Sequence, residues 1–224
     1  MNYTFQFRDV FAASDLLHDG LLLTLELSVV TMMSGLIIGI SGAAARVYGP
    51  GWLRRPVAVY VEAIRNTPLI VQLFLIFFGL PSAGIKFDAA TAAMLALSIN
   101  LGAYSIEIIR AGLEAIPRSQ IEAGQSLGLS GPQIFRYVII FPALKLMYPA
   151  LASQFVLLML ATSVVSQISA QDLFHMASII QSRTFRDFEV YILVAAAYLV
   201  LALVFRLLFA ALYQLVFARS KSSR

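Results

Sequence analysis

Two pairs of opposite charges lie inside otherwise apolar stretches of the chain. Glu62 and Arg65 are three residues apart, as are Glu107 and Arg110, so both members of each pair share one face of a helix. Such a pair can neutralise itself near a membrane interface, and we expect structural or gating ion pairs at both places. A proton relay is the less favoured alternative, because no series of carboxylates or histidines crosses the apolar stretches.

Few residue types are available for other chemistry. The chain has no cysteine, which excludes disulfides, thiol catalysis and cysteine-ligated zinc, and its two histidines, His18 and His175, leave little for a metal site. No Ser-His-Asp arrangement and no Gly-x-x-x-x-Gly-Lys-Ser/Thr phosphate-binding loop occurs in the sequence. We therefore expect a non-catalytic chain that binds no metal and no cofactor of its own.

The composition indicates a membrane protein. Of the 224 residues, 60% are hydrophobic and 12% are charged, whereas soluble domains have about 45–50% and about 25%. The net charge of +4 does not indicate a nucleic-acid partner, because the basic residues are scattered among apolar stretches and form no continuous stripe. Much of the surface is therefore expected to face the lipid bilayer.

Five apolar stretches are long enough to cross the roughly 30 Å hydrocarbon core, which takes about 20 helical residues. We therefore predict an all-α integral membrane protein with five transmembrane helices. Within the second stretch, Asn66-Thr67-Pro68 should end one helix and start another, with Thr67 as the cap and Pro68 in the first helical position. In the first stretch, Gly35, Gly39 and Gly42 form a small-residue face that lets another helix approach closely. The five stretches are residues 21–45, 57–80, 89–116, 146–171 and 190–218.

The positions of lysine and arginine predict the orientation, because cytoplasmic loops collect these residues. With five spans, most of the 16 basic residues fall on the side of the C-terminus, so the N-terminus should lie outside and the C-terminus in the cytoplasm. Residues 1–20 are then an extracytoplasmic segment that can form a short interfacial helix, and residues 219–224 are a cytoplasmic tail. The first segment lacks the positive region of a signal peptide, so we expect no cleavage. Outside, residues 174–188 are either a surface for an extracytoplasmic partner or a solvated loop.

The cytoplasmic segment 117–145 is longer than a connection between antiparallel helices needs. Residues 118–127 should form a short helix, residues 128–131 a turn, and Ser130 with Gln133 a capping box that starts a second helix. The segment carries more apolar side chains than a solvated linker, and Glu122 is its only acidic residue among three basic ones. We expect this loop to dock into a cleft on a cytoplasmic partner.

This loop also resembles a known motif. Residues 122–128 read Glu-Ala-Gly-Gln-Ser-Leu-Gly, with a proline further on at Pro142, and are similar to the EAA loop of ATP-binding-cassette importer permeases. Other stretches resemble the polar amino acid permeases in particular, and the matches extend over residues 20–218. They include Thr-Leu-Glu-Leu-Ser at 24–28, Arg-Asn-Thr-Pro-Leu-Ile-Val-Gln at 65–72, Gly102-Ala103-Tyr104, Glu107, Arg110 and Thr162-Ser163.

The resemblance implies the transmembrane permease subunit of a binding-protein-dependent, ATP-driven amino acid importer in the inner (plasma) membrane of a bacterium. Glu122, Ala123 and Gly128 would then couple the chain to ABC ATPase subunits, which would hold ATP and Mg²⁺. A second permease and an extracytoplasmic amino-acid-binding protein complete the implied assembly. The alternatives are a stand-alone secondary transporter or channel, for which we find no midplane ion site, and a membrane scaffold.

The fourth span departs from the pattern of this family. Many relatives read Asn-Glu and, five residues later, Lys-Asp-Thr-Ser, whereas this chain reads Ser153-Gln154 and Leu160-Ala161-Thr162-Ser163. Three ionisable groups are therefore missing from a region that faces the mid-membrane cavity in the family, and a charged substrate would lack countercharges there. We favour a heterodimer with a permease that carries these charges over a homodimer that moves a less charged substrate.

Uncharged polar residues remain near the expected path. Amide and hydroxyl groups can bind an α-carboxylate or α-amino group without carrying charge. Serine and threonine in membrane helices can instead bond to their own backbone. The candidates for the path are Asn100, Tyr104, Gln154, Thr162, Ser163, Ser166 and Gln167.

Overall fold

The computed structural model describes residues 4–217, so the predicted tail at 219–224 lies outside the described residues. Every regular element in the described part is a helix, which confirms the predicted all-α class. Four continuous helical stretches there are long and apolar enough to span a membrane, and a bent helix pair can supply a fifth span. The four are α2 (Ser14–Tyr48), α5 (Ala89–Glu114), the stretch Gly131–Ile168 and α10 (Asp187–Phe217).

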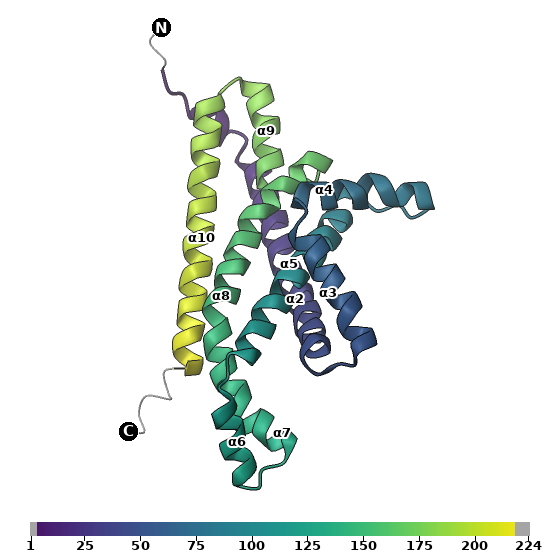
Figure 1. The fold of residues 1–224 in the computed structure, drawn as a ribbon. Helices are drawn as coiled ribbons and strands as arrows, with labels where there is room; N and C mark the ends of the chain where they lie inside the picture. The colour runs from purple at the N-terminus through teal and green to yellow at the C-terminus, as the bar shows by residue number, and fades with distance from the viewer. Residues whose placement is uncertain (1–3, 218–224) are drawn as a thin grey trace.

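The second predicted span is broken, as the sequence indicates. Helix α3 (Gly51–Arg65) and the following arm are bent by 109° at the break. The arm consists of α4 (Leu69–Phe74), the π-helical η1 (Leu75–Gly79) and the 3₁₀-helical η2 (Leu80–Ala83), and Figure 1 shows it projecting sideways from the bundle.

The capping prediction at this break is wrong in detail. Pro68 is the N-cap of α4, with ψ at 140°, and does not occupy the first helical position. The Thr67 hydroxyl donates to the Ala63 carbonyl at 2.8 Å. Thr67 therefore satisfies the carboxyl end of α3, where free carbonyls need donors, and does not cap α4.

The N-terminal segment packs against later parts of the chain. Helix α2 begins at Ser14, so the second part of the predicted segment 1–20 belongs to the first long helix. Val10, in the short helix α1 (Arg8–Phe11), is fully buried in a cluster with Leu173, Ala177, Ile180, Val190 and Val194. These partners belong to α9 (Leu173–Thr184) and α10, so residues 174–188 are largely a helix with a buried face and not a solvated loop.

The fourth span begins earlier than predicted. The short helix α7 (Gly131–Ile134) continues through the π-helical turn η3 (Phe135–Ile139) into α8 (Ile140–Ala161) and the 3₁₀ helix η4 (Thr162–Ile168). The last part of the predicted loop, up to residue 145, is therefore helical and continuous with the fourth predicted span. Pro142 does not stop the helix, because η3 has already interrupted the regular pattern of backbone bonds just before it.

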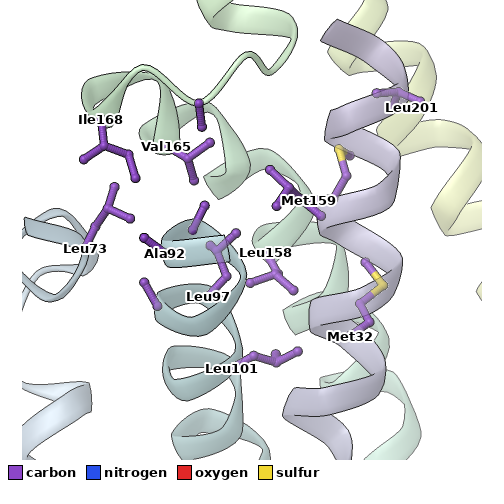
Figure 2. Packing of buried hydrophobic residues seen from close by; sticks show 14 of the residues in the cluster. Met32, Leu73, Ala92, Leu97, Leu101, Leu158, Met159, Val165, Ile168 and Leu201 are labelled. Atoms are coloured by element: carbon purple, nitrogen blue, oxygen red, sulfur yellow. The ribbon is translucent and has the colours of Figure 1, made fainter. Parts of the chain in front are cut away.

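Helix α5 lies at the centre of the bundle, and small residues let α2 pack closely against it (Figure 1). A Cβ atom on Gly35 would lie 2.7 Å from the Leu101 side chain, and one on Gly39 would collide with Ser105. The predicted packing face on the first span is confirmed. Figure 2 shows the adjoining apolar cluster, in which Leu97 and Leu101 of α5 meet Met32 of α2 and Met159 of α8.

Candidate functional site

The loop predicted to dock on a partner forms a helical hairpin, residues 118–134, that extends beyond one end of the bundle (Figure 1). Helix α6 (Arg118–Ser126) confirms the predicted first helix. Gly128 in the turn has φ of 76°, a left-handed conformation that glycine adopts without steric cost. The predicted capping box is present, with the Ser130 N–H donating to Gln133 Oε1 at 2.8 Å.

The two helices of the hairpin pack against each other and leave most of the other side chains exposed. Gly124 is buried between its helices, where a Cβ would lie 3.3 Å from the Ile134 side chain, so α6 packs against the start of the next helix. Glu122 and Ala123 are exposed, and the apolar Leu127 next to the turn is 80% exposed. An exposed carboxylate and an exposed leucine on the same short hairpin are groups that a cleft with a basic residue and an apolar wall can bind.

The break between α3 and α4 is tied to the central helix by two amide side chains. Gln72 of α4 is buried and donates from Nε2 to the carbonyls of Ile64, at 2.8 Å, and Thr67, at 3.0 Å. Its Oε1 accepts from Asn100 Nδ2 at 2.9 Å. Asn100, a predicted path residue, therefore helps to hold the bend, and Gln72 is a contributor that the sequence analysis missed. In the sequence, the available signal for Gln72 was that it is a single amide side chain within an apolar stretch.

The two predicted ion pairs have different outcomes. Arg110 bonds to Glu107, with its Nε 3.2 Å from Glu107 Oε2, and it also pairs with Glu114 one turn further on. Within residues 4–217, Arg65 forms no ion pair with Glu62, so this prediction is wrong. The Arg65 guanidinium instead lies over the Tyr104 ring, 5.4 Å from its centroid, where the ring face attracts the cation.

Two cavities meet at these residues. A polar cavity of about 450 Å³ is lined by side chains of α2, α3 and α5, and a more apolar one of about 380 Å³ lies between α5 and α8. Arg65, Tyr104 and Glu107 line both cavities, so they form the wall that the two share. Arg46 and Arg110 line the polar cavity as well, which places three guanidinium groups around it.

The predicted polar residues of the fourth span are arranged differently. The hydroxyls of Thr162, Ser163 and Ser166 donate to the carbonyls of Met159, Leu160 and Ser163 at 2.7–2.8 Å, so all three bond to their own backbone. Gln154 is half-buried and Gln167 is exposed. The residues of α8 that line the apolar cavity are Leu146, Met147 and Ala150. The cavities that Tyr104 lines therefore do not include these five residues.

The comparison with protein families decides what kind of chain carries this arrangement. Residues 35–221 match the family described as binding-protein-dependent transport system inner membrane component. The chain belongs to this family. The match includes the hairpin, the broken span and the charged cavity, and it confirms the resemblance inferred from the sequence motifs.

Relatives within this family have been named as transport proteins. The glutamine transport system permease protein GlnP of Escherichia coli K12 is 38% identical over 203 residues, which cover 89% of this chain and 92% of that protein. The L-cystine transport system permease protein TcyB of Bacillus subtilis is 38% identical over 168 residues, covering 75% and 72%.

Solved structures agree with this assignment. A crystal structure described as an amino acid ABC transporter with histidines has a chain 39% identical to this one, with a TM-score of 0.88 over 95% of this chain and 99% of that chain. An inward-facing methionine ABC transporter, MetNI, is 22% identical with a TM-score of 0.73, covering 90% and 96%, and shares the fold. The protein is therefore a membrane permease subunit, in agreement with its apolar helices.

Proposed function

We propose that this chain is the permease subunit of an ATP-driven amino acid importer in a bacterial inner membrane. The observation that carries the proposal is the α6–α7 hairpin, which presents Glu122 and Leu127 at one end of a membrane-spanning bundle. Relatives that are 38% identical are named as permeases for glutamine and for cystine. The chain would form half of the translocation path and bind an ATPase subunit through the hairpin.

The rest of the assembly follows from this role. ATP and Mg²⁺ would be bound by the ATPase, because this sequence has no phosphate-binding loop. An extracytoplasmic binding protein would deliver the amino acid at the end of the bundle that carries α9, and closure of two ATPase subunits would drive the paired permeases between outward and inward openings. With the N-terminus outside, the hairpin lies in the cytoplasm.

The charged cavity suits the cytoplasmic end of such a path. An amino acid carries an α-carboxylate, and Arg46, Arg65 and Arg110 surround a space of about 450 Å³ in which that group would find countercharges. Arg110 is held by two carboxylates and Arg65 contacts a ring, whereas Arg46 has no hydrogen bond or ion pair among the described residues. Arg46 and Arg65 are therefore the guanidinium groups available to a passing carboxylate.

The test is uptake into proteoliposomes that contain the complex purified with its native partners. With ATP enclosed and the binding protein outside, radiolabelled glutamine should accumulate, and without ATP it should not. Uptake driven by a sodium or proton gradient in the absence of ATP would favour the secondary transporter. Absence of uptake under every condition, with the complex intact, would favour a scaffold.

Reversing the charge at Glu122 tests the role of the hairpin. We expect Glu122→Lys to lower ATP-driven uptake at least tenfold, because the lysine would repel a basic residue of the ATPase that the carboxylate binds. Expression and the thermal midpoint should stay unchanged, since the side chain is exposed. Asp19→Lys makes the same reversal at an exposed residue of α2 and should keep full uptake. Normal uptake by Glu122→Lys would contradict the coupling role.

A further inference from the structure

Arg206 is a charge inside the most apolar helix of the protein. It lies in α10 about three turns before the end of that helix at Phe217, which corresponds to about 16 Å of helix axis. The side chain is exposed, and it forms no hydrogen bond, ion pair or ring contact with any residue in the described range. An uncompensated cation inside a bilayer is costly, so its counter-ion is expected to come from outside the described part of this chain.

Arg206 lines a groove between α8 and α10 with a volume of about 570 Å³. Ser153 of α8 and Gln214 of α10 line the same groove, and neither side chain has a hydrogen-bond partner among the described residues. The Tyr148 hydroxyl is already used, because it donates to the Phe209 carbonyl at 2.6 Å and joins the two helices. The groove thus holds a guanidinium, a hydroxyl and an amide that all need partners.

A second cation lies in α8, one helical turn before the groove wall begins. Lys145 is exposed and precedes Pro149, a residue of the groove wall, by one helical turn, so both lie on the same face of α8. It forms no ion pair within the described part of the chain. Two cations without an ion pair therefore belong to the helices that form the groove: Arg206 in its wall, and Lys145 in the part of α8 nearer the α6–α7 hairpin.

The groove is placed where lipid reaches it. Figure 1 shows α10 lying along α8 at one edge of the bundle, while the arm α4–η2 projects from the opposite edge. The neighbouring side chains of α10 are apolar and uncovered, with Leu203 49% and Leu207 70% exposed. A molecule that combines an anionic group with long apolar chains matches the polar groove and its apolar surroundings together.

We propose that this groove binds an anionic glycerophospholipid of the leaflet next to the α6–α7 hairpin. The guanidinium of Arg206 holds the phosphate, since its planar fork fits two phosphate oxygens, and Ser153 and Gln214 donate further hydrogen bonds. Lys145 lies toward the membrane surface and favours a headgroup without its own cation, as basic pockets between transmembrane helices do. This inference requires that α10 spans the membrane and does not depend on what the protein transports.

The experiment is native mass spectrometry of the delipidated complex, with its partner subunits, titrated with phosphatidylglycerol or phosphatidylcholine. We expect phosphatidylglycerol to stay bound to the complex and phosphatidylcholine to be lost. Arg206→Gln should weaken phosphatidylglycerol binding at least tenfold, and Arg206→Lys, which keeps the charge but not the fork, should give an intermediate value. Arg55→Gln removes an exposed arginine of α3 away from the groove and should bind like the wild type.

Three results would overturn the proposal. Equal binding of the two lipids by the wild type would show that the groove does not select an anion. Undiminished phosphatidylglycerol binding by Arg206→Gln would place the lipid elsewhere. Efficient cross-linking of Arg206→Cys to a second permease would assign this residue to a contact between subunits. Should Arg206→Gln fail to assemble, Lys145→Gln gives the same test at an exposed position, with a smaller expected loss.

Discussion

Asp172 is a buried carboxylate that fixes the start of α9. Its side chain is fully buried and accepts hydrogen bonds from the N–H groups of Phe174 and His175, at 3.2 and 3.0 Å. The Tyr198 hydroxyl of α10 donates to it at 3.2 Å. Burial raises the pKa of Asp172 from 3.8 to about 6, against the opposing effect of these hydrogen bonds. This residue therefore makes stability depend on pH.

The direction of that dependence follows from proton binding. Because the pKa is higher in the folded protein, the folded state binds more protons between about pH 4 and 6, and the free energy of unfolding falls as pH rises through this range. The fall is up to about 3 kcal/mol. Asp172→Asn keeps a capping oxygen but cannot ionise. We therefore expect the thermal midpoint of this variant not to decrease between about pH 4 and 6 as that of the wild type does.

Thermal denaturation in detergent at a series of pH values measures the effect. Asp19→Asn removes an exposed carboxylate near the start of α2 and should keep the wild-type dependence. A curve for Asp172→Asn that runs parallel to the wild type from pH 4 to 6 would show that the buried carboxylate does not titrate in this range.

At the scale of elements, the bend between α3 and α4 depends on the amide pair of Gln72 and Asn100. We expect Gln72→Leu and Asn100→Leu each to cost about 1–2 kcal/mol, because each leaves buried polar groups without a partner. The double variant should cost less than the sum of the two by about 1 kcal/mol, since the bond between the amides is lost only once. The measurement is a double-mutant cycle, in which thermal midpoints are compared in nanodiscs for the wild type, the two single variants and the double variant.

A matched pair keeps the cycle interpretable. Gln72→Leu combined with Gln125→Leu joins the buried amide to an exposed one in α6, and these two effects should add because the sites lie in separate parts of the molecule. Additive losses for Gln72 and Asn100 as well would mean that their hydrogen bond contributes nothing to the bend, and that packing of α4 against α5 holds it alone.

The long helices were predictable because an apolar run of about 20 residues is a strong signal. Predicted stretches 89–116 and 190–218 differ from α5 and α10 by a few residues at their ends. Helix α9 was missed because Ser169, which ends η4 before it, and Phe185, which ends α9, adopt left-handed conformations without being glycine and so give no turn signal. Asp172, as a capping residue, was the available clue.

The candidate site was predictable in part, for a different physical reason. Spacing along a helix specifies which residues share a face, and this gave the pair of Glu107 and Arg110 correctly. It does not specify what another helix brings to that face, and Tyr104 of α5 competes successfully for Arg65. The backbone bonds of Thr162 and Ser163 are the alternative that the sequence left open for hydroxyls in membrane helices, and spacing alone does not choose between it and a role in the path.

At the scale of the whole molecule, the single chain leaves part of its apolar surface uncovered. On the projecting arm, Leu75 is 65% exposed and Phe78 is 61% exposed. This arm lies on the edge of the bundle opposite α10, which suits an interface with a second permease (Figure 1). A path formed between two permeases, as proposed, would also explain why the cavities of one chain do not include the polar residues of the fourth span.

The composition of the complex is therefore the prediction that tests the molecule as a whole. We expect native mass spectrometry of the tagged chain, purified from its own membrane, to show two ATPase subunits and one different permease. That permease should carry the Lys, Asp and Glu that this chain replaces with Leu160, Ala161 and Gln154, because a charged substrate needs countercharges on at least one side of the path. Two copies of this chain with two ATPases would contradict the heterodimer. In that case the fourth span would offer only amides and hydroxyls to the mid-membrane part of the path. Uptake should then be competed by glutamine and not by arginine or glutamate, since uncharged groups can match an uncharged side chain and cannot neutralise a charged one.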